Sequence, residues 1–187
     1  MRIGIISDTH GSFSAFQRAL EVLGPCLGII HLGDVLAHGP RNDIPEGYNP
    51  KAFAEYLAGR EEFLYIKGNC DAEVDEMVTG KDISKEERIL EFDDIRVYCT
   101  HGHTKTVEDM VKTAEKYAAP LALYGHTHVK GMERWGSVLV VNPGSTTIPK
   151  DDGPSVAVFD TEEKTVKLLS LEDGAILAES KLLEGRS

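Results

Sequence analysis

Short apolar runs alternate with amphipathic segments over the first third of the chain. Apolar runs bounded by polar residues predict buried strands, and three occur here, at Arg2–Ser7, Gly28–Leu32 and Phe63–Ile66. Between them, apolar residues at helical spacing predict one helix from a Ser12 N-cap to about Leu23 and a second from Asn49 to about Gly59. This β-α-β-α-β order predicts parallel strands joined by crossover helices.

The rest of the chain is dominated by strand patterns. Alternating apolar and polar positions between turn residues predict further strands, at Ile89–Phe92, Ile95–Cys99, Leu121–Tyr124, Val129–Trp135, Ser137–Val141 and after Ser155. One helix is predicted at Val107–Tyr117, and the acidic stretch Ala72–Glu87 is expected to form a short helix and a solvated loop. We expect mostly antiparallel pairing in this half, and an α/β layered fold overall. Because the chain has no repeat, low-complexity segment or linker, we predict one domain over residues 1–187.

Polar residues gather directly after five of the predicted strands. The clusters are Asp8-Thr9-His10, Gly33-Asp34, Gly68-Asn69, His101-Gly102-His103 and Gly125-His126-Thr127-His128. Open α/β sheets collect ligand-binding loops at the carboxyl ends of their strands, so we expect these clusters to meet. If the backbone stays extended beyond Gly125, His126 and His128 project to the same side.

These clusters combine the donor types of a metal site. Carboxylate, amide and imidazole groups are present and no thiolate is required, which argues against a structural cysteine-type zinc site. Seven candidate ligands are too many for one tetrahedral ion and suit two ions that share a carboxylate: Asp8, His10, Asp34, Asn69, His101, His126 and His128. Two metal ions roughly 3.5–4 Å apart are an established device for displacement at phosphorus. Mixed nitrogen and oxygen donors favour Mn, Fe, Co, Ni or Zn over Mg or Ca.

The charge and composition limit the partners and the location. The formal net charge is −11, which argues against a nucleic-acid surface but allows a phosphate substrate if metal ions supply positive charge. No apolar run is long enough to span a bilayer, and the N-terminal apolar run is too short for a signal peptide. Cys26, Cys70 and Cys99 are odd in number and scattered, so we expect free thiols and a cytoplasmic protein.

Taken in order, the strand-end clusters resemble those of the calcineurin-like metallophosphoesterases, from residue 2 to about residue 150. Within that family the chain is similar to the small bacterial YfcE-type phosphodiesterases, through residues 33–42, 45–48, 68–71 and 142–145. The resemblance implies a four-layer α-β-β-α sandwich, a small phosphodiester substrate and a dinuclear site that is commonly activated by manganese. It also implies that Asp8, His10 and His128 hold one ion, that Asn69, His101 and His126 hold the other, and that Asp34 bridges them.

One position departs from the wider family. Many members carry Gly-Asn-His-Asp, whose histidine is thought to protonate the leaving group, whereas this chain has Cys70 there. A thiol is a poor acid for an alkoxide, so His103 or a water at the metal site is an alternative proton donor. We therefore hypothesise that the enzyme prefers leaving groups that need little protonation. The other interpretation of Cys70 is a small residue packed under the site.

Other residues have weaker assignments. Arg41 and His38, on the long loop after Asp34, are candidates for contact with substrate phosphate. Asp71 is expected either to orient a ligand histidine or to cap the next helix. His31, which lies inside a predicted strand, is expected to be a core histidine, and residues 142–145 are expected to shape the edge of the site.

Two other functions stay open on the same core. The first is a phosphomonoesterase or protein phosphatase, although the chain shows no long cap region. The second is a non-catalytic interaction scaffold, because the retromer subunit Vps29 resembles this fold and has lost part of the ligand set that is complete here. The strands after Ser155 offer a possible edge for a homo-oligomer.

Overall fold

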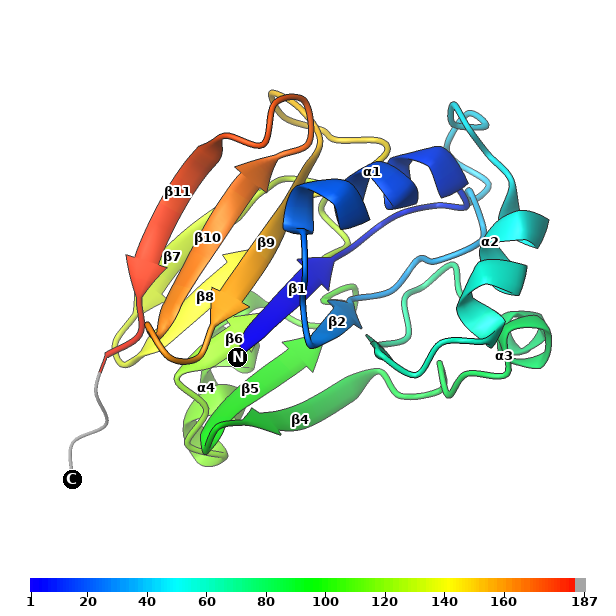
Figure 1. Ribbon diagram of the computed structural model, residues 1–187. Helices are drawn as coiled ribbons and strands as arrows, with labels where there is room; N and C mark the ends of the chain where they lie inside the picture. The colour runs from blue at the N-terminus through cyan, green and yellow to red at the C-terminus, as the bar shows by residue number, and fades with distance from the viewer. Residues whose placement is uncertain (184–187) are drawn as a thin grey trace.

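Two β-sheets packed face to face form the centre of the protein, and helices cover their outer sides (Figure 1). The computed structural model describes residues 1–183. The expected four-layer α-β-β-α sandwich is confirmed. The single domain over residues 1–187 stays a prediction, and its last four residues lie outside the described part of the chain.

The first sheet contains the strands that the N-terminal apolar runs predicted. Its order is β11-β10-β9-β1-β2-β3. The parallel strands are β1 (Arg2–Ile6), β2 (Gly28–His31) and β3 (Phe63–Tyr65), connected through the helices α1 (Phe13–Leu23) and α2 (Pro50–Ala58). The antiparallel strands are β9 (Ser155–Asp160), β10 (Thr165–Ser170) and β11 (Ile176–Lys181). The predicted β-α-β-α-β unit is therefore present.

The strands of the second half of the chain pair mostly antiparallel, as expected, but the centre of the second sheet is parallel. Its order is β4-β5-β6-β8-β7, with β4 (Glu87–Phe92), β5 (Ile95–Thr100), β6 (Leu121–Leu123), β7 (Gly131–Trp135) and β8 (Val138–Asn142). The three central strands β5, β6 and β8 are parallel, and only the outer strands β4 and β7 pair antiparallel. Strands β6 and β8 are buried along their whole length, as expected for parallel strands covered on both faces.

Three apolar clusters hold the four layers together. Between the sheets, Ile5 and Leu32 belong to the same buried cluster as Leu123. On the outer side of the first sheet, Phe16 of α1 packs against Phe53 of α2 with ring centroids 4.3 Å apart. On the outer side of the second sheet, the buried face of α4 (Val107–Lys116) joins Tyr98, Val138 and Val140. The short helix α3 (Glu73–Thr79) follows β3 and contacts α2.

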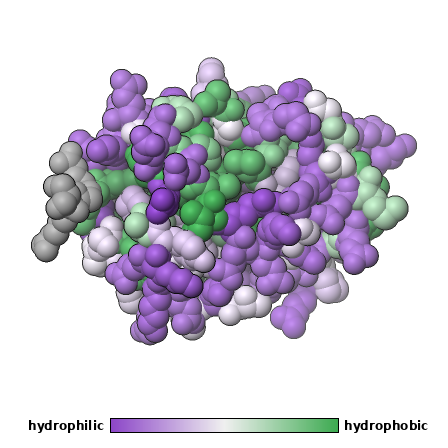
Figure 2. All heavy atoms as spheres, turned by 90° about the horizontal axis from the view of Figure 1, so that it is seen from below, coloured by the Kyte–Doolittle hydropathy of each residue, from purple (hydrophilic) through white to green (hydrophobic). Residues whose placement is uncertain are grey.

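The surface is mostly hydrophilic on the face shown in Figure 2, where hydrophobic side chains gather in one area near the middle. Among the helices of residues 1–183, none has the length and apolar character needed to cross a membrane. Cys26, Cys70 and Cys99 are all free thiols. Cys99 is buried in the core, whereas Cys26 is only partly buried, beside the cluster under α1.

His31 is a buried core histidine, as predicted, and it is fully hydrogen-bonded. Its Nδ1 accepts the Gly33 N–H at 3.2 Å, so its Nε2–H donates to the Thr9 hydroxyl at 3.0 Å. This fixed tautomer joins the loop after β1 to the loop after β2. Burial lowers the pKa of His31 to about 3, which keeps the ring neutral in the folded protein.

The low pKa of His31 predicts a loss of stability in acid. An unfolded histidine binds a proton below about pH 6.5, whereas folded His31 does not until the pH approaches 3. The folded state therefore loses stability as the pH falls below about 6.5, by about 2 kcal/mol between pH 7 and pH 5 from this residue. Urea unfolding of the chelator-treated wild type and of His31→Gln at both pH values measures this loss. The loss of stability between pH 7 and pH 5 should be smaller in His31→Gln than in the wild type by about the contribution of His31. An equal pH dependence in both proteins would contradict the assignment.

Candidate metal centre and active site

The parallel strands of both sheets carry the candidate site at their carboxyl ends. From the first sheet, Asp8 and His10 follow β1, Asp34 follows β2 and Asn69 follows β3. From the second sheet, His101 follows β5, and His126 and His128 follow β6. The side-chain distances below show that these loops meet, so the expectation that the clusters converge is confirmed.

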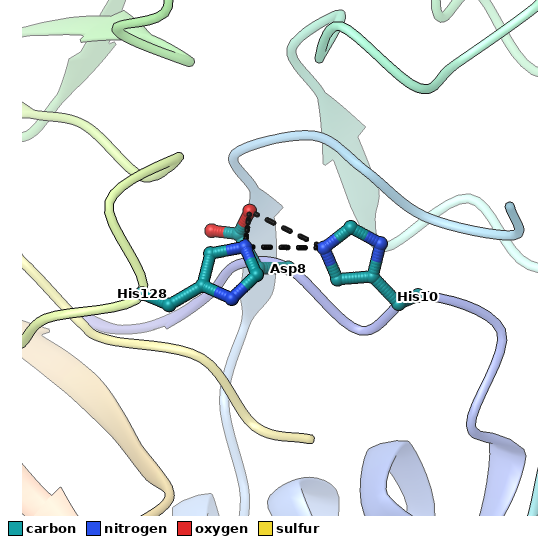
Figure 3. Close-up of side chains that lie close together, drawn as sticks. All are labelled: Asp8, His10 and His128. Carbon is teal, nitrogen blue, oxygen red and sulfur yellow. Dashed lines mark hydrogen bonds and ion pairs between the residues drawn. The ribbon is translucent and has the colours of Figure 1, made fainter. Parts of the chain in front are cut away.

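The first group consists of Asp8, His10 and His128 (Figure 3). The Nε2 atoms of His10 and His128 are 3.2 Å apart. The Oδ1 atom of Asp8 lies 3.2 Å from His128 Nε2 and 3.8 Å from His10 Nε2. All three side chains are buried. Three ligand-type atoms therefore face one another across a space in which an ion could bind.

The second group surrounds His101. Its Nε2 lies 3.5 Å from Asp34 Oδ2 and 3.2 Å from Asn69 Oδ1. The His126 ring lies beside it, with centroids 5.2 Å apart. Asp34 Oδ2 is also 3.7 Å from His10 Nε2, so this carboxylate lies between the two groups. Asp8 is close to both groups as well, because its Oδ1 is 4.0 Å from His101 Nε2.

Hydrogen bonds to the backbone fix the tautomers of three histidines. The Nδ1 atoms of His10, His101 and His128 lie 2.9, 2.7 and 2.9 Å from the carbonyl oxygens of Ala37, Leu32 and Ile148. A carbonyl only accepts, so each Nδ1 carries a hydrogen and each Nε2 faces the carboxylates. Lone pairs and carboxylate oxygens this close repel one another unless a proton or a metal ion lies between them. The donor set therefore fits divalent cations.

The charges at the site also favour a bound cation. Burial opposes ionisation of Asp34, but the adjacent His101 ring and the Cys70 N–H hold its pKa below the ordinary value. Burial lowers the pKa of His101, but Asp34 and Asp8 outweigh it and raise that pKa to about 9. The second oxygen of Asp8, Oδ1, is buried and has no hydrogen-bond partner within residues 1–183. The carboxylates thus remain ionised and attract positive charge.

The backbone of the candidate ligands corrects the expected geometry of His126 and His128. Both residues have left-handed φ values, +65° and +59°, so the chain is not extended beyond Gly125. They do not share a side: His128 joins Asp8 and His10, whereas His126 lies beside His101. Left-handed φ values also occur at Asp8, His10 and Asp34. Such conformations are unfavourable for residues other than glycine, and they concentrate at functional sites.

Asp71 has a role that neither interpretation of its sequence position anticipated. Its carboxylate accepts the N–H groups of Asp34, Val35 and Gly68 at 2.8, 2.7 and 2.7 Å. Among the residues that the structure describes, its carboxylate has no hydrogen bond to a ligand histidine, and the N-cap of α3 is Ala72. Burial raises the pKa of Asp71 to about 6, while the backbone N–H groups act against that rise. Asp71 therefore joins the loops after β2 and β3.

Further polar residues support the loops from behind. Asn142 donates to Gly125 O at 2.8 Å and Ser145 donates to Asp8 O at 2.8 Å, which confirms that residues 142–145 shape the site. Thr9 and Thr147 were missed in the sequence: the Thr9 hydroxyl donates to Val35 O, and that of Thr147 donates to Thr9 O. No local pattern reveals these contacts, because their partners are distant in the chain.

The remaining candidate residues lie around this centre. His103 is close to His101 and His126, with ring centroids 5.5 and 6.0 Å away, and its buried Nδ1 has no partner within the described chain. The His38 ring lies edge-on against Tyr48. Arg41 is exposed on the same loop. Their roles in proton donation and substrate contact stay predictions.

The close approach of Gly68 to Asp34 gives a direct test of the site. A Cβ at Gly68 would overlap the Asp34 carboxylate and backbone nitrogen. Gly68→Ala should therefore displace that carboxylate and lower the affinity for divalent metal by at least about tenfold. Calorimetric titration with Mn²⁺ measures this, with Gly131→Ala as the matched control because a Cβ there meets no atom within 4 Å. Equal affinity in the two variants would contradict the arrangement.

Comparison with known proteins agrees with the fold and the site. The model of the calcineurin-like phosphoesterase superfamily domain matches residues 1–164. The chain therefore belongs to the calcineurin-like phosphoesterases. Membership of this family of metallophosphoesterases implies a hydrolase that uses divalent metal ions.

Individual relatives are similar over nearly the whole chain. Phosphodiesterase YfcE of Escherichia coli K12 is 35% identical over 96% of this chain and 97% of its own length. Its solved structure has a TM-score of 0.86 with 33% identity, covering 98% of this chain and all of that one. Phosphodiesterase MJ0936 of Methanocaldococcus jannaschii is 31% identical over 92% of this chain and 100% of its own. Vps29 of Entamoeba histolytica, at 18% identity over 94% and 96% of the two chains with a TM-score of 0.65, shares the fold alone.

Proposed function

We propose that this protein is a phosphodiesterase that hydrolyses a small phosphodiester with water at a centre of two divalent metal ions. One observation carries the proposal: two groups of imidazole and carboxylate donors converge on either side of Asp34 Oδ2. The relatives named YfcE and MJ0936, both phosphodiesterases, support the choice of a diester. When bound, the ions would supply Lewis-acid stabilisation of the phosphate and a lower pKa for the attacking water.

The proposal assigns roles to the residues of this chain. Asp8, His10 and His128 hold one ion, Asn69, His101 and His126 hold the other, and Asp34 is shared. His103 is the candidate proton donor to the leaving group, and Arg41 and His38 are the candidate phosphate contacts. Manganese is the proposed working ion, with Zn, Fe, Ni or Co as alternatives, and the cytoplasm is the proposed location.

The experiment removes metal with a chelator and adds back Mn, Zn, Mg, Co or Ni singly. The rate of hydrolysis of bis-p-nitrophenyl phosphate is then compared with that of the p-nitrophenyl monoester. We expect the diester to be hydrolysed faster, and only with metal. A preference for the monoester would replace the diesterase by a phosphomonoesterase. No turnover with any ion, despite bound metal, would favour the scaffold interpretation.

Cys70 should limit the range of leaving groups. Burial and the Asp34 carboxylate raise the pKa of its thiol to about 12, which makes it a weak proton donor. Cys70→His should therefore raise the rate for a diester with a poor leaving group, such as diphenyl phosphate, by about 10²-fold. The rate for bis-p-nitrophenyl phosphate should change much less. Equal effects on both substrates would reject the idea that protonation limits the range.

A further inference from the structure

The Cys70 thiol lies among the candidate ligands. Its Sγ, a ring nitrogen of His10 and a carboxylate oxygen of Asp34 all lie within 4.8 Å of one another. The Cys70 N–H donates to Asp34 Oδ1 at 2.8 Å, which fixes the position of the residue relative to that carboxylate. Cys70 is only partly buried.

A second observation indicates that a cation binds at this place. Asp8 Oδ1 is buried and has no hydrogen-bond partner in the described chain, and it lies 3.8 Å from His10 Nε2. Because His10 Nδ1 donates its hydrogen to Ala37 O, the Nε2 atom keeps a lone pair that can bind a metal ion. His10, whose Nε2 faces this carboxylate oxygen, therefore connects Asp8 to the group that contains the Cys70 sulfur.

The choice of ion decides whether sulfur takes part. Thiolate is a soft ligand that suits Zn²⁺, Cd²⁺ and Co²⁺, whereas Mn²⁺ favours oxygen donors. We propose that Cys70 is a conditional ligand, which binds zinc, cadmium or cobalt together with His10 and Asp34 but leaves manganese uncoordinated by sulfur. This inference rests on the metal centre of the proposed function and adds a residue to it.

The step is a ligand exchange without oxidation or reduction. The S–H bond breaks, its proton passes to solvent, an S–metal bond forms and the ion releases one water. A catalytic ion needs a position open to water or substrate, whereas a closed ligand set is typical of structural sites. Sulfur ligation would occupy that position. Zinc should therefore bind more tightly than manganese and support slower hydrolysis than manganese does.

Cobalt absorption tests the sulfur contact without any substrate. Titration of the full, chelator-treated chain with Co²⁺ should give a near-ultraviolet thiolate-to-cobalt charge-transfer band. The band should be absent in Cys70→Ser and Cys70→Ala, and present in the matched control Cys26→Ser, whose cysteine lies outside the site. Calorimetry should show that Cys70→Ser lowers the affinity for Zn²⁺ by at least about tenfold while the affinity for Mn²⁺ changes less than about twofold.

Each other outcome overturns the inference. No band in the wild type, a band that persists in both Cys70 variants, or equal losses of Zn²⁺ and Mn²⁺ affinity would exclude sulfur as a selective ligand. A Cys70 variant counts in this test if its far-ultraviolet circular dichroism matches that of the wild type. One such variant is enough. A Cys70-dependent band in a protein that hydrolyses no ester would refute the proposed function alone, whereas hydrolysis without the band would refute this inference alone.

Discussion

Asp34→Asn should reduce hydrolysis of bis-p-nitrophenyl phosphate by at least about 10³-fold, because it removes the charge shared by both metal positions. Asp34 Oδ2 lies 3.7 Å from His10 Nε2 and 3.5 Å from His101 Nε2, closer to both nitrogens than Asp8 Oδ1, which lies 3.8 and 4.0 Å away. Asparagine keeps the size of the side chain but offers one neutral oxygen. The expected change is therefore in metal binding and rate, with the fold preserved.

Three measurements separate these effects. Metal content after gel filtration should fall from about two ions per chain toward one, kcat/KM should fall as stated, and circular dichroism should stay unchanged. Asp43→Asn is the matched control because Asp43 is exposed on the loop that follows Asp34. Retention of more than about a tenth of wild-type kcat/KM in Asp34→Asn would rule out a shared carboxylate at this position.

Asp71→Asn should lower the free energy of unfolding by about 2–3 kcal/mol. Both oxygens of this carboxylate are used: Oδ2 accepts the N–H groups of Asp34 and Gly68, and Oδ1 accepts that of Val35. In asparagine one of the two positions becomes an NH₂ group. It would then point a donor at a backbone donor, and a buried N–H would be left without an acceptor.

Urea unfolding at pH 7 measures this loss, again with Asp43→Asn as the control, which should stay within about 0.5 kcal/mol of the wild type. Because Asp71 holds the backbone of Asp34, we also expect kcat/KM to fall by about 10- to 100-fold. A variant as stable as the wild type would show that water replaces these bonds. A less stable variant with unchanged kcat/KM would show that Asp71 supports the fold without positioning Asp34.

The sequence was a good guide wherever a local pattern determines the structure. Apolar runs identified β1, β2 and β3, and Ser12 and Asn49 accept backbone N–H bonds as helix caps, as their types predicted. The polar clusters were found because each directly follows a strand. Once the strands are parallel, their ends must meet at one edge, so convergence of the candidate ligands followed without knowledge of any distance.

What could not be predicted depends on contacts between distant parts of the chain. The parallel pairing of β6 and β8 requires β7 to pair on the far side of β8, and the alternation of residues does not encode that order. The opposite directions of His126 and His128 come from left-handed backbone that the surrounding loops impose. The bond from Ser145 to Asp8 joins residues 137 positions apart, and a serine after a glycine gives no sign of it.

The division of the candidate ligands between the two sheets has a consequence for the life of the protein in a cell. Asp8, His10, Asp34 and Asn69 belong to loops of one sheet, whereas His101, His126 and His128 belong to loops of the other. Once the proposed ions are bound, each would tie the two halves of the sandwich together at its open edge. Metal-depleted molecules would open there more often and be degraded sooner by proteases. The supply of the ion would then set the abundance of the protein as well as its activity.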